Sequence, residues 1–267
     1  MFVRPALGRL VAGRPAAVLL SLRRLSTSLS AEPKQNVFSD FVEHSTRPLS
    51  HGDLLFVAEP VDPSVRLDLA VQSIGQATIL WLQRHGALVS RPFHIVQHVG
   101  MVVADQFGHA EKVVEAQRVA GVRVLSLPDF LGEFVPGSRF FHAWLPEATK
   151  EQRQSAVSYA LHRVGAAYAH DFSEPNQKCA RQSKYYCSSL VDYAYREALG
   201  QDLVFSDEAF PLVFEPRVFW EEFYREQSMG LPSGCGSNPT MLLHSSRVRY
   251  ARYEPFKTVE EECHEMF

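Results

Sequence analysis

The segment from Lys178 to Tyr193 places a cysteine where an irregular polar stretch gives way to a predicted helix. Apolar residues then recur at helical spacing, at Leu190, Val191, Ala194, Ala198 and Leu199, and Gly200 follows as a stop signal. Cys187 is therefore expected in the first turn of this helix. Unpaired amide N–H groups and the positive end of the helix dipole favour a thiolate there. Because a thiolate is a nucleophile, Cys187 is the first candidate for chemistry.

A predicted hairpin upstream supplies a candidate base and a residue to orient it. Residues 97–103 and 112–116 have the pattern of strands, and residues 105–108 are turn formers. If the hairpin is symmetric, position i pairs with position 213 − i, so His98 lies opposite Glu115. Directly opposed residues share a face and have Cβ atoms roughly 4.5–5.5 Å apart. A carboxylate at that distance can hold one imidazole nitrogen and leave the other for a thiol.

The other histidines and cysteines are weaker candidates. His94 has the same strand parity as His98, but its symmetric partner is Val119, which has no group to orient it. Cys179, Cys235 and Cys263 have no motif around them, and we expect them to be structural or incidental. No CxxC pair occurs, so the sequence predicts neither a metal site nor a disulfide framework, and it calls for no cofactor.

These segments together resemble a known family. The strings Gly52-Asp53-Leu54-Leu55-Phe56, His98-Val99-Gly100-Met101, Val114-Glu115-Ala116 and Tyr186-Cys187-Ser188, in that order, are similar to the permuted papain-like amidases of the YiiX/YaeF type, in the NlpC-like superfamily. The resemblance spans about residues 50–245. It implies an α+β fold, circularly permuted papain-like, with an antiparallel, partly barrel-like sheet packed on helices. It also implies Cys187 as nucleophile, His98 as base and Glu115 as the residue orienting it.

The chain departs from the family pattern at three places. Ser189 stands where the family usually has Glu, two positions after the cysteine. The Tyr and Asp of the family's segment before the cysteine are separated in the string from Gly165 to Phe172, and extra polar sequence follows Phe172. All three departures leave the Cys, His and Glu positions intact and bear on substrate preference.

Several residues near the triad are candidates for substrate binding. Tyr168, Tyr185 and Tyr186 can line the site or donate a hydroxyl to an oxyanion, and packing is an equal explanation for each. The backbone N–H of Cys187 is an oxyanion donor by position. Gly100 either lets substrate approach the strand or accommodates packing.

The first thirty residues have the composition of a mitochondrial targeting peptide. They contain five arginines, no acidic residue and clustered serines, and cleavage after Leu25 is expected. We therefore predict a mitochondrial, matrix location. Without residues 1–30 the chain keeps 22 basic and 30 acidic residues, a net charge of −8, which argues against nucleic-acid binding. No apolar stretch is long enough to span a bilayer.

The remaining chain is expected to form one domain, residues 51–255, between a linker at 31–50 and an acidic tail at 256–267. We predict a first strand at about 52–58, a helix from Asp62 to Gly86, strands at 121–127 and 138–144, and a last strand at 248–253. A second helix should start at a capping box of Thr149 and Gln152 and end at Gly165.

Three functions remain open on the sequence. The first is a cysteine hydrolase acting on an amide of a peptide or lipid through an acyl-thioester. The second is a lipid acyltransferase or thioesterase with the same triad, using an apolar channel of Trp81, Phe93 and the phenylalanines of 205–224. The third is a non-catalytic mitochondrial subunit that keeps the fold.

Overall fold

The computed structural model describes residues 47–61, 93–172, 184–212, 214, 217–226 and 228–253. Several predictions fall outside these residues. They are the targeting peptide, most of the linker, the helix at 62–86, Cys179, Cys263, Trp81 and the acidic tail.

Six antiparallel strands form one sheet in the order β4-β3-β2-β1-β5-β6. Their bounds are β1 Leu54–Val61, β2 Phe93–Ala104, β3 Ala110–Gln117, β4 Gly121–Ser126, β5 Arg139–Trp144 and β6 Arg249–Tyr253. The central strand β1 is apolar on both faces and buried from Leu54 to Ala58. A strand buried on both faces needs cover on both sides of the sheet.

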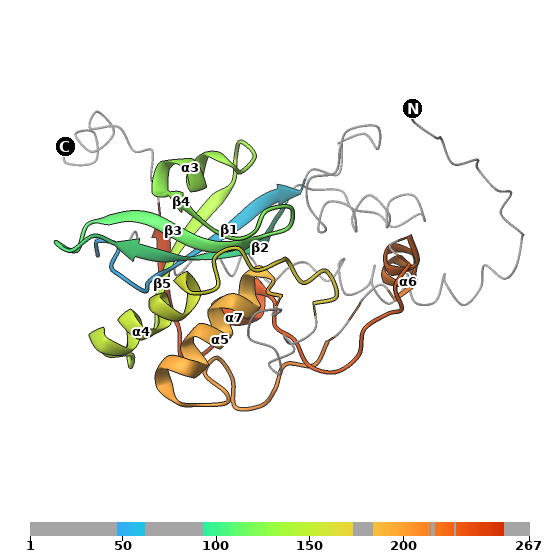
Figure 1. Ribbon diagram of the computed structural model, residues 1–267. Coiled ribbons are helices and arrows are strands. Elements are labelled where there is room, and N and C mark those ends of the chain that lie inside the picture. Colours follow the sequence, from blue (N-terminus) through green and yellow to red (C-terminus); the bar gives the residue numbers. More distant parts are fainter. Residues whose placement is uncertain are drawn as a thin grey trace, which may run out of the picture.

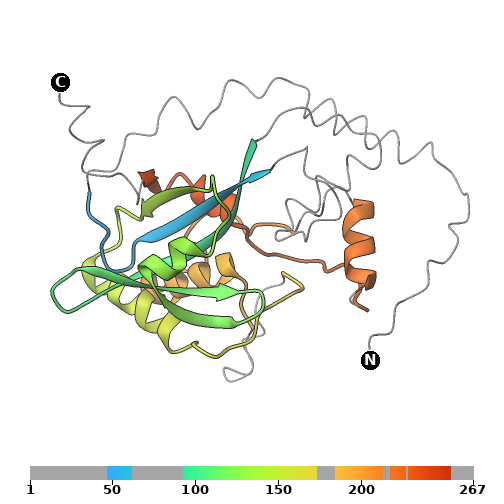
Figure 2. The ribbon, with the colours of Figure 1, turned by 90° about the horizontal axis from the view of Figure 1, so that it is seen from above.

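Helices provide that cover, as Figure 1 shows. The short helix α3, Leu127–Gly132, lies over one face, and α4, Lys150–Leu161, α5, Cys187–Leu199, and α7, Pro239–Leu243, lie under the other. Helix α6, Arg217–Glu226, stands beside this layered body in both views (Figures 1 and 2). Among the described residues, no helix combines the length and apolarity needed to cross a membrane.

The predicted helix signals agree with the structure at three of four ends. Thr149 and Gln152 form the expected capping box of α4. That helix ends at Leu161 with His162 as its C-cap, so the predicted end at Gly165 was late by one turn. Helix α5 begins at Cys187 and ends at Leu199, and Gly200 is its C-cap, with a positive φ of 63° that suits glycine.

Ser189 has a local role at the start of α5. Its hydroxyl accepts a hydrogen bond from the backbone N–H of Tyr186 at 2.9 Å, which is half of a capping box. The same hydroxyl donates to the carbonyl of Tyr186 at 2.9 Å. The residue that departs from the family pattern therefore stabilises the turn that presents Cys187.

The hairpin of β2 and β3 forms where predicted, but its register is not symmetric about the turn. The ladder pairs Met101 with Val114 and Val103 with Lys112, so position i faces position 215 − i, and the prediction of 213 − i was wrong. A bulge between Val103 and Ala104 accounts for part of the shift. Because the shift is an even number of residues, every side chain keeps its predicted face. His98 and Glu115 become diagonal neighbours on one face and are not directly opposed.

The same two strands part beyond Met101 and Val114. From there, β2 continues paired with β1 through His98 and Val96, whereas β3 continues paired with β4 through Glu115 and Gln117. In the described residues, no ladder joins β2 to β3 in this half of the hairpin. The sheet is therefore open between these strands, next to His98 and Glu115.

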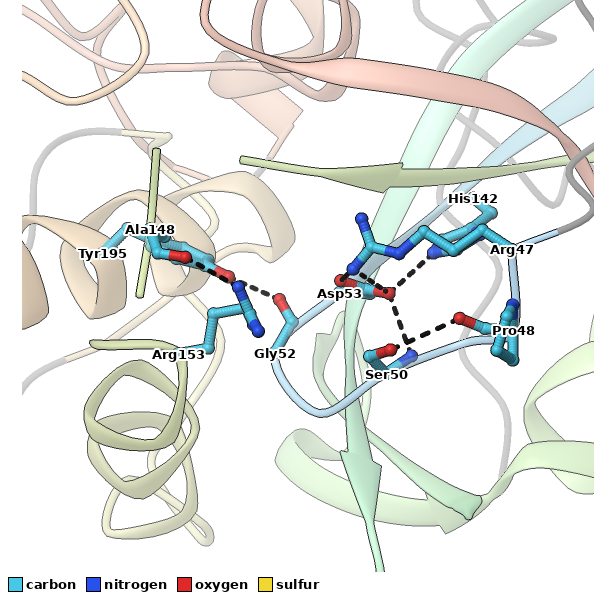
Figure 3. A network of polar contacts seen from close by, with 9 residues as sticks. All are labelled: Arg47, Pro48, Ser50, Gly52, Asp53, His142, Ala148, Arg153 and Tyr195. Carbon is cyan, nitrogen blue, oxygen red and sulfur yellow. Dashed lines mark hydrogen bonds and ion pairs between the residues drawn. The ribbon is translucent and has the colours of Figure 1, made fainter. Parts of the chain in front are cut away.

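A buried polar network fixes the start of β1 (Figure 3). The carboxylate of Asp53 is fully buried, and it accepts hydrogen bonds from Nε2 of His142 at 2.7 Å, from the backbone N–H of Ser50 at 2.9 Å and from Arg47 at 3.1 Å. On the other side of the same turn, the hydroxyl of Tyr195 in α5 donates to the carbonyl of Gly52. These contacts tie β1 to β5 and to α5.

Candidate active site

Cys187 is buried at the first position of α5, within the core that α5 shares with the sheet. Its S–H points to the backbone carbonyl of Gln97 in β2, with 3.9 Å from sulfur to oxygen. It also lies close enough to His98 to raise the pKa of that imidazole. The start of α5 therefore places the sulfur against β2 at the opening between β2 and β3.

His98 contacts Cys187 and Glu115 at the same time. Nε2 of its ring hydrogen-bonds to Oε2 of Glu115, and since an ionised carboxylate only accepts, Nε2 carries the hydrogen. Nδ1 is then the ring nitrogen left for Cys187. The ring packs against Phe130 and Phe134, with centroids 6.0 and 5.6 Å away. The structure thus brings together the three residues predicted as a triad.

These contacts favour a charged imidazole. Burial by itself lowers the pKa of His98, but the hydrogen bonds and charges of Cys187 and Glu115 more than offset this and raise the pKa to about 10. For Glu115, burial by itself raises the pKa, but the hydrogen bonds and charges of His98 and Arg123 hold this pKa below its ordinary value. Both shifts describe an imidazolium held against an ionised carboxylate.

The two shifts predict how this site contributes to stability across pH. A raised histidine pKa stabilises the fold fully below its unfolded value of 6.5, and this contribution is lost as pH rises towards about 10. A lowered carboxyl pKa stabilises the fold above its ordinary value of 4.5, and this is lost at lower pH. We expect the melting temperature of the protein to exceed that of His98→Gln most between pH 4.5 and 6.5. Thermal melts should show the difference shrinking from pH 6.5 to 10; a constant difference would contradict this assignment.

Arg123 belongs to the site although we did not predict it. It lies directly opposite Glu115 in the β3 and β4 ladder, and its Nε donates to Oε1 of Glu115 at 2.8 Å. A signal for this pair was present in the sequence, because a symmetric turn centred on residue 119 places residue 123 opposite residue 115.

Helix α3 was also missed in the sequence analysis. Its Ser126 N-cap, proline in the first turn and Asp129 are helix-start signals, but the helix has only six residues.

The three tyrosines named from the sequence take different positions. Tyr168 lies beside Tyr185 in a parallel bridge, and burial and the neighbouring Cys187 raise its pKa well above the ordinary value. Its hydroxyl therefore keeps its proton and remains a donor. The hydroxyl of Tyr186 accepts from the backbone N–H of Ser237 at 2.8 Å. Tyr185 is turned to the end of α4: its hydroxyl contacts that of Tyr159 in α4 at 3.1 Å and accepts from Arg163, two residues after the helix, at 3.0 Å.

The remaining candidates are explained by local packing. A Cβ at Gly100 would lie 2.4 Å from Cγ1 of Val113 and 3.2 Å from Phe130, so neighbouring side chains fill the space that the glycine leaves. This favours the packing explanation over a substrate contact. Nε2 of His94 bonds to the carbonyl of Gly137 at 3.0 Å. Cys235 has a free thiol and is half-buried, and its backbone pairs with Pro211 in an isolated antiparallel β-bridge.

The chain is similar to a solved structure, the crystal structure of the metalloprotein yiiX from Escherichia coli O157:H7. The TM-score is 0.50 at 18% sequence identity, and the alignment covers 76% of this chain and 96% of yiiX, which shows a shared fold. No curated protein matches the chain significantly. Although yiiX is described as a metalloprotein, the described residues here include no group of three or more His, Cys, Asp or Glu side chains suited to hold a metal ion.

The family comparison covers most of the described body. Residues 49–224 match the permuted papain-like amidase enzymes, YaeF/YiiX, of the C92 family. That stretch begins before β1, ends within α6 and includes the whole antiparallel sheet except β6. The α+β fold with a permuted papain-like arrangement is thus as predicted, and the chain belongs to the permuted papain-like amidase family YaeF/YiiX.

Proposed function

We propose that this protein is a cysteine-dependent amidase whose triad is Cys187, His98 and Glu115. One observation carries the proposal: His98 bonds to the carboxylate of Glu115, and the sulfur of Cys187 lies against the same stretch of β2, close enough to shift the pKa of His98. A nucleophile within reach of a base, which a third group orients, is the arrangement that covalent acyl transfer needs. The amide specificity rests on the family.

The geometry supports a two-step reaction. The thiolate of Cys187 attacks the carbonyl carbon, a C–S bond forms, and the carbonyl electron pair becomes an oxyanion. As that oxyanion collapses, the C–N bond breaks, and the imidazolium of His98 gives its proton to the leaving amine. Neutral His98 then takes a proton from water, whose oxygen attacks the thioester. A second collapse breaks the C–S bond and releases the carboxylic acid, while the proton remains on His98 beside the restored thiolate.

Two groups are suited to stabilise the oxyanion. The backbone N–H of Cys187 is in the first turn of α5, where amides have no acceptor within the helix. Tyr168 is buried near Cys187, and because both burial and that neighbour raise the pKa of Tyr168, it keeps its hydroxyl proton. We assign the first oxyanion contact to the amide and the second to Tyr168.

Acyl trapping tests this proposal. We expect p-nitrophenyl acetate to release a burst of p-nitrophenol and to leave one acetyl group on the protein. Peptide mass spectrometry after an acid quench should find the acetyl group on the Cys187 peptide. Cys235 is the internal control, because it is also a free thiol but lies outside the triad. Acetylation of Cys235 at the same rate, or no acetylation, would overturn the proposal and favour a non-catalytic subunit.

A lipid acyl substrate is the second candidate. Phe172 packs against Tyr186, the residue before the nucleophile, with ring centroids 5.6 Å apart, and against Trp220 of α6 at 6.1 Å. An aromatic cluster therefore begins one residue from Cys187. Trp81 lies outside the described residues, and the side chain of Phe93 is not described, so the cluster rests on α6 and Phe172. p-Nitrophenyl esters of increasing acyl length distinguish the candidates, because rates that rise with chain length favour the lipid substrate.

We also propose a mitochondrial location. It rests on the arginine-rich, acid-free composition of residues 1–30 alone.

A further inference from the structure

The carboxylate of Glu115 is held from two sides by two cations. His98 occupies Oε2, and Arg123 occupies Oε1 with both Nε, at 2.8 Å, and a terminal nitrogen, at 2.6 Å. Glu115 is almost completely buried, with 1% of its side chain exposed. A buried carboxylate whose two oxygens are bonded in opposite directions has a fixed rotamer and a fixed charge.

Arg123 is held in turn by Glu133, which caps the C-terminal end of α3. The exposed share of each side chain rises from 1% at Glu115 to 24% at Arg123 and 38% at Glu133. Charges of alternating sign therefore lead from His98, beside Cys187, through Glu115 and Arg123 to Glu133 near the surface.

We propose that Arg123, held by Glu133, is a positioning residue for the reaction proposed above. It keeps Glu115 ionised and keeps Oε2 aimed at His98. Without Arg123, the buried carboxylate has one cationic partner in place of two, so it can rotate or take up a proton. A protonated or rotated Glu115 no longer holds the Nε2 hydrogen of His98, and the imidazolium beside Cys187 loses its support.

A purely structural role is the competing explanation, because Arg123 also joins β4, β3 and α3. The two roles differ in what they do to Cys187. A structural clamp changes only the melting temperature, whereas a positioning residue also changes the pH at which the thiolate and imidazolium form. The charged groups that act on His98 are Cys187, Glu115 and the half-buried Glu59, and those on Glu115 are His98 and Arg123.

The test is the rate of alkylation of Cys187 by iodoacetamide from pH 4 to 9, followed by peptide mass spectrometry. We expect Arg123→Met to move the acid limb of this profile to higher pH by about one unit, so the rate at a fixed pH on that limb falls about tenfold. Arg123→Lys should restore part of the shift, because a single ammonium keeps the charge but not the two-nitrogen contact. Glu133→Gln, at the partly exposed end, should give a smaller shift in the same direction.

Arg217→Met is the matched control. It removes an arginine from an exposed ion pair with Glu221 in α6, and the alkylation profile should stay unchanged. If Arg123→Met and Glu133→Gln lower the melting temperature but their alkylation profiles match that of the unmodified protein, the positioning role is wrong. Since alkylation needs no substrate, a shift in the profile without acetyl transfer from p-nitrophenyl acetate would support positioning by Arg123 and contradict the proposed function.

Discussion

Cys187→Ala should abolish the hydrolysis of p-nitrophenyl acetate, with a loss on the order of 10⁴-fold or more in turnover. The variant lacks the atom that forms the thioester, and members of a triad act as a unit, so removing one costs nearly all of the catalysis that they provide. His98→Asn should lower turnover by about 10²- to 10⁴-fold, since it removes the general base. Steady-state release of p-nitrophenol measures both losses.

The double variant sharpens this prediction. If Cys187 and His98 act together, Cys187→Ala combined with His98→Asn should be no slower than Cys187→Ala alone. Cys235→Ala is the matched control for removal of a free thiol, and its turnover should equal that of the unmodified protein. Additive losses in the double variant would mean that the two residues act independently, and activity that survives in Cys187→Ala would exclude this sulfur as the nucleophile.

Among the substitutions proposed here, Asp53→Ala should cause the largest fall in the free energy of unfolding. The substitution removes the carboxylate that accepts hydrogen bonds from the fully buried His142, from Arg47 and from the Ser50 amide (Figure 3). Removing the acceptor of a buried hydrogen bond costs about 1–3 kcal/mol in the free energy of unfolding for each bond, and more where a charged group is involved. For a protein of this size we expect the melting temperature to fall by on the order of 10 °C.

An exposed pair with similar chemistry provides the control. Asp207 bonds to Arg247 at 2.7 Å, but 90% of its side chain is exposed. Asp207→Ala should therefore change the melting temperature by a small fraction of the change in Asp53→Ala, because water replaces the lost partner. Equal changes in the two variants, measured by thermal denaturation, would show that the burial of Asp53 does not determine its contribution.

Local signals in the sequence were enough to predict the parts of the site that depend on periodicity and capping. The start of α5 at Cys187 and the shared face of His98 and Glu115 follow from helical spacing and strand parity. The register of the hairpin did not follow, because a bulge depends on contacts beyond the turn. An even shift kept the pair together, whereas a shift of one residue would have turned Glu115 away from His98.

Other parts depend on tertiary contacts that the residue pattern does not contain. Helix α3 is too short to have a helical period, yet it supplies Phe130, which packs on His98, and ends at Glu133, which holds Arg123. The contact between Cys187 and β2 depends on how α5 packs under the sheet, and segments about ninety residues apart in the chain must first fold together. These features became visible only with the strands and helices in place.

The parting of β2 and β3 links the chemistry to both layers of the protein. His98 packs on the α3 side of the sheet, whereas Cys187 belongs to the core under the opposite side, and they meet only because the ladder stops at Met101 and Val114. A sulfur and an imidazole anchored in separate layers stay aligned only while both layers hold their places. The reactivity of the Cys187 thiol is thus a sensitive measure of the intact fold. A small displacement of either helical layer would lower that reactivity before the sheet unfolds.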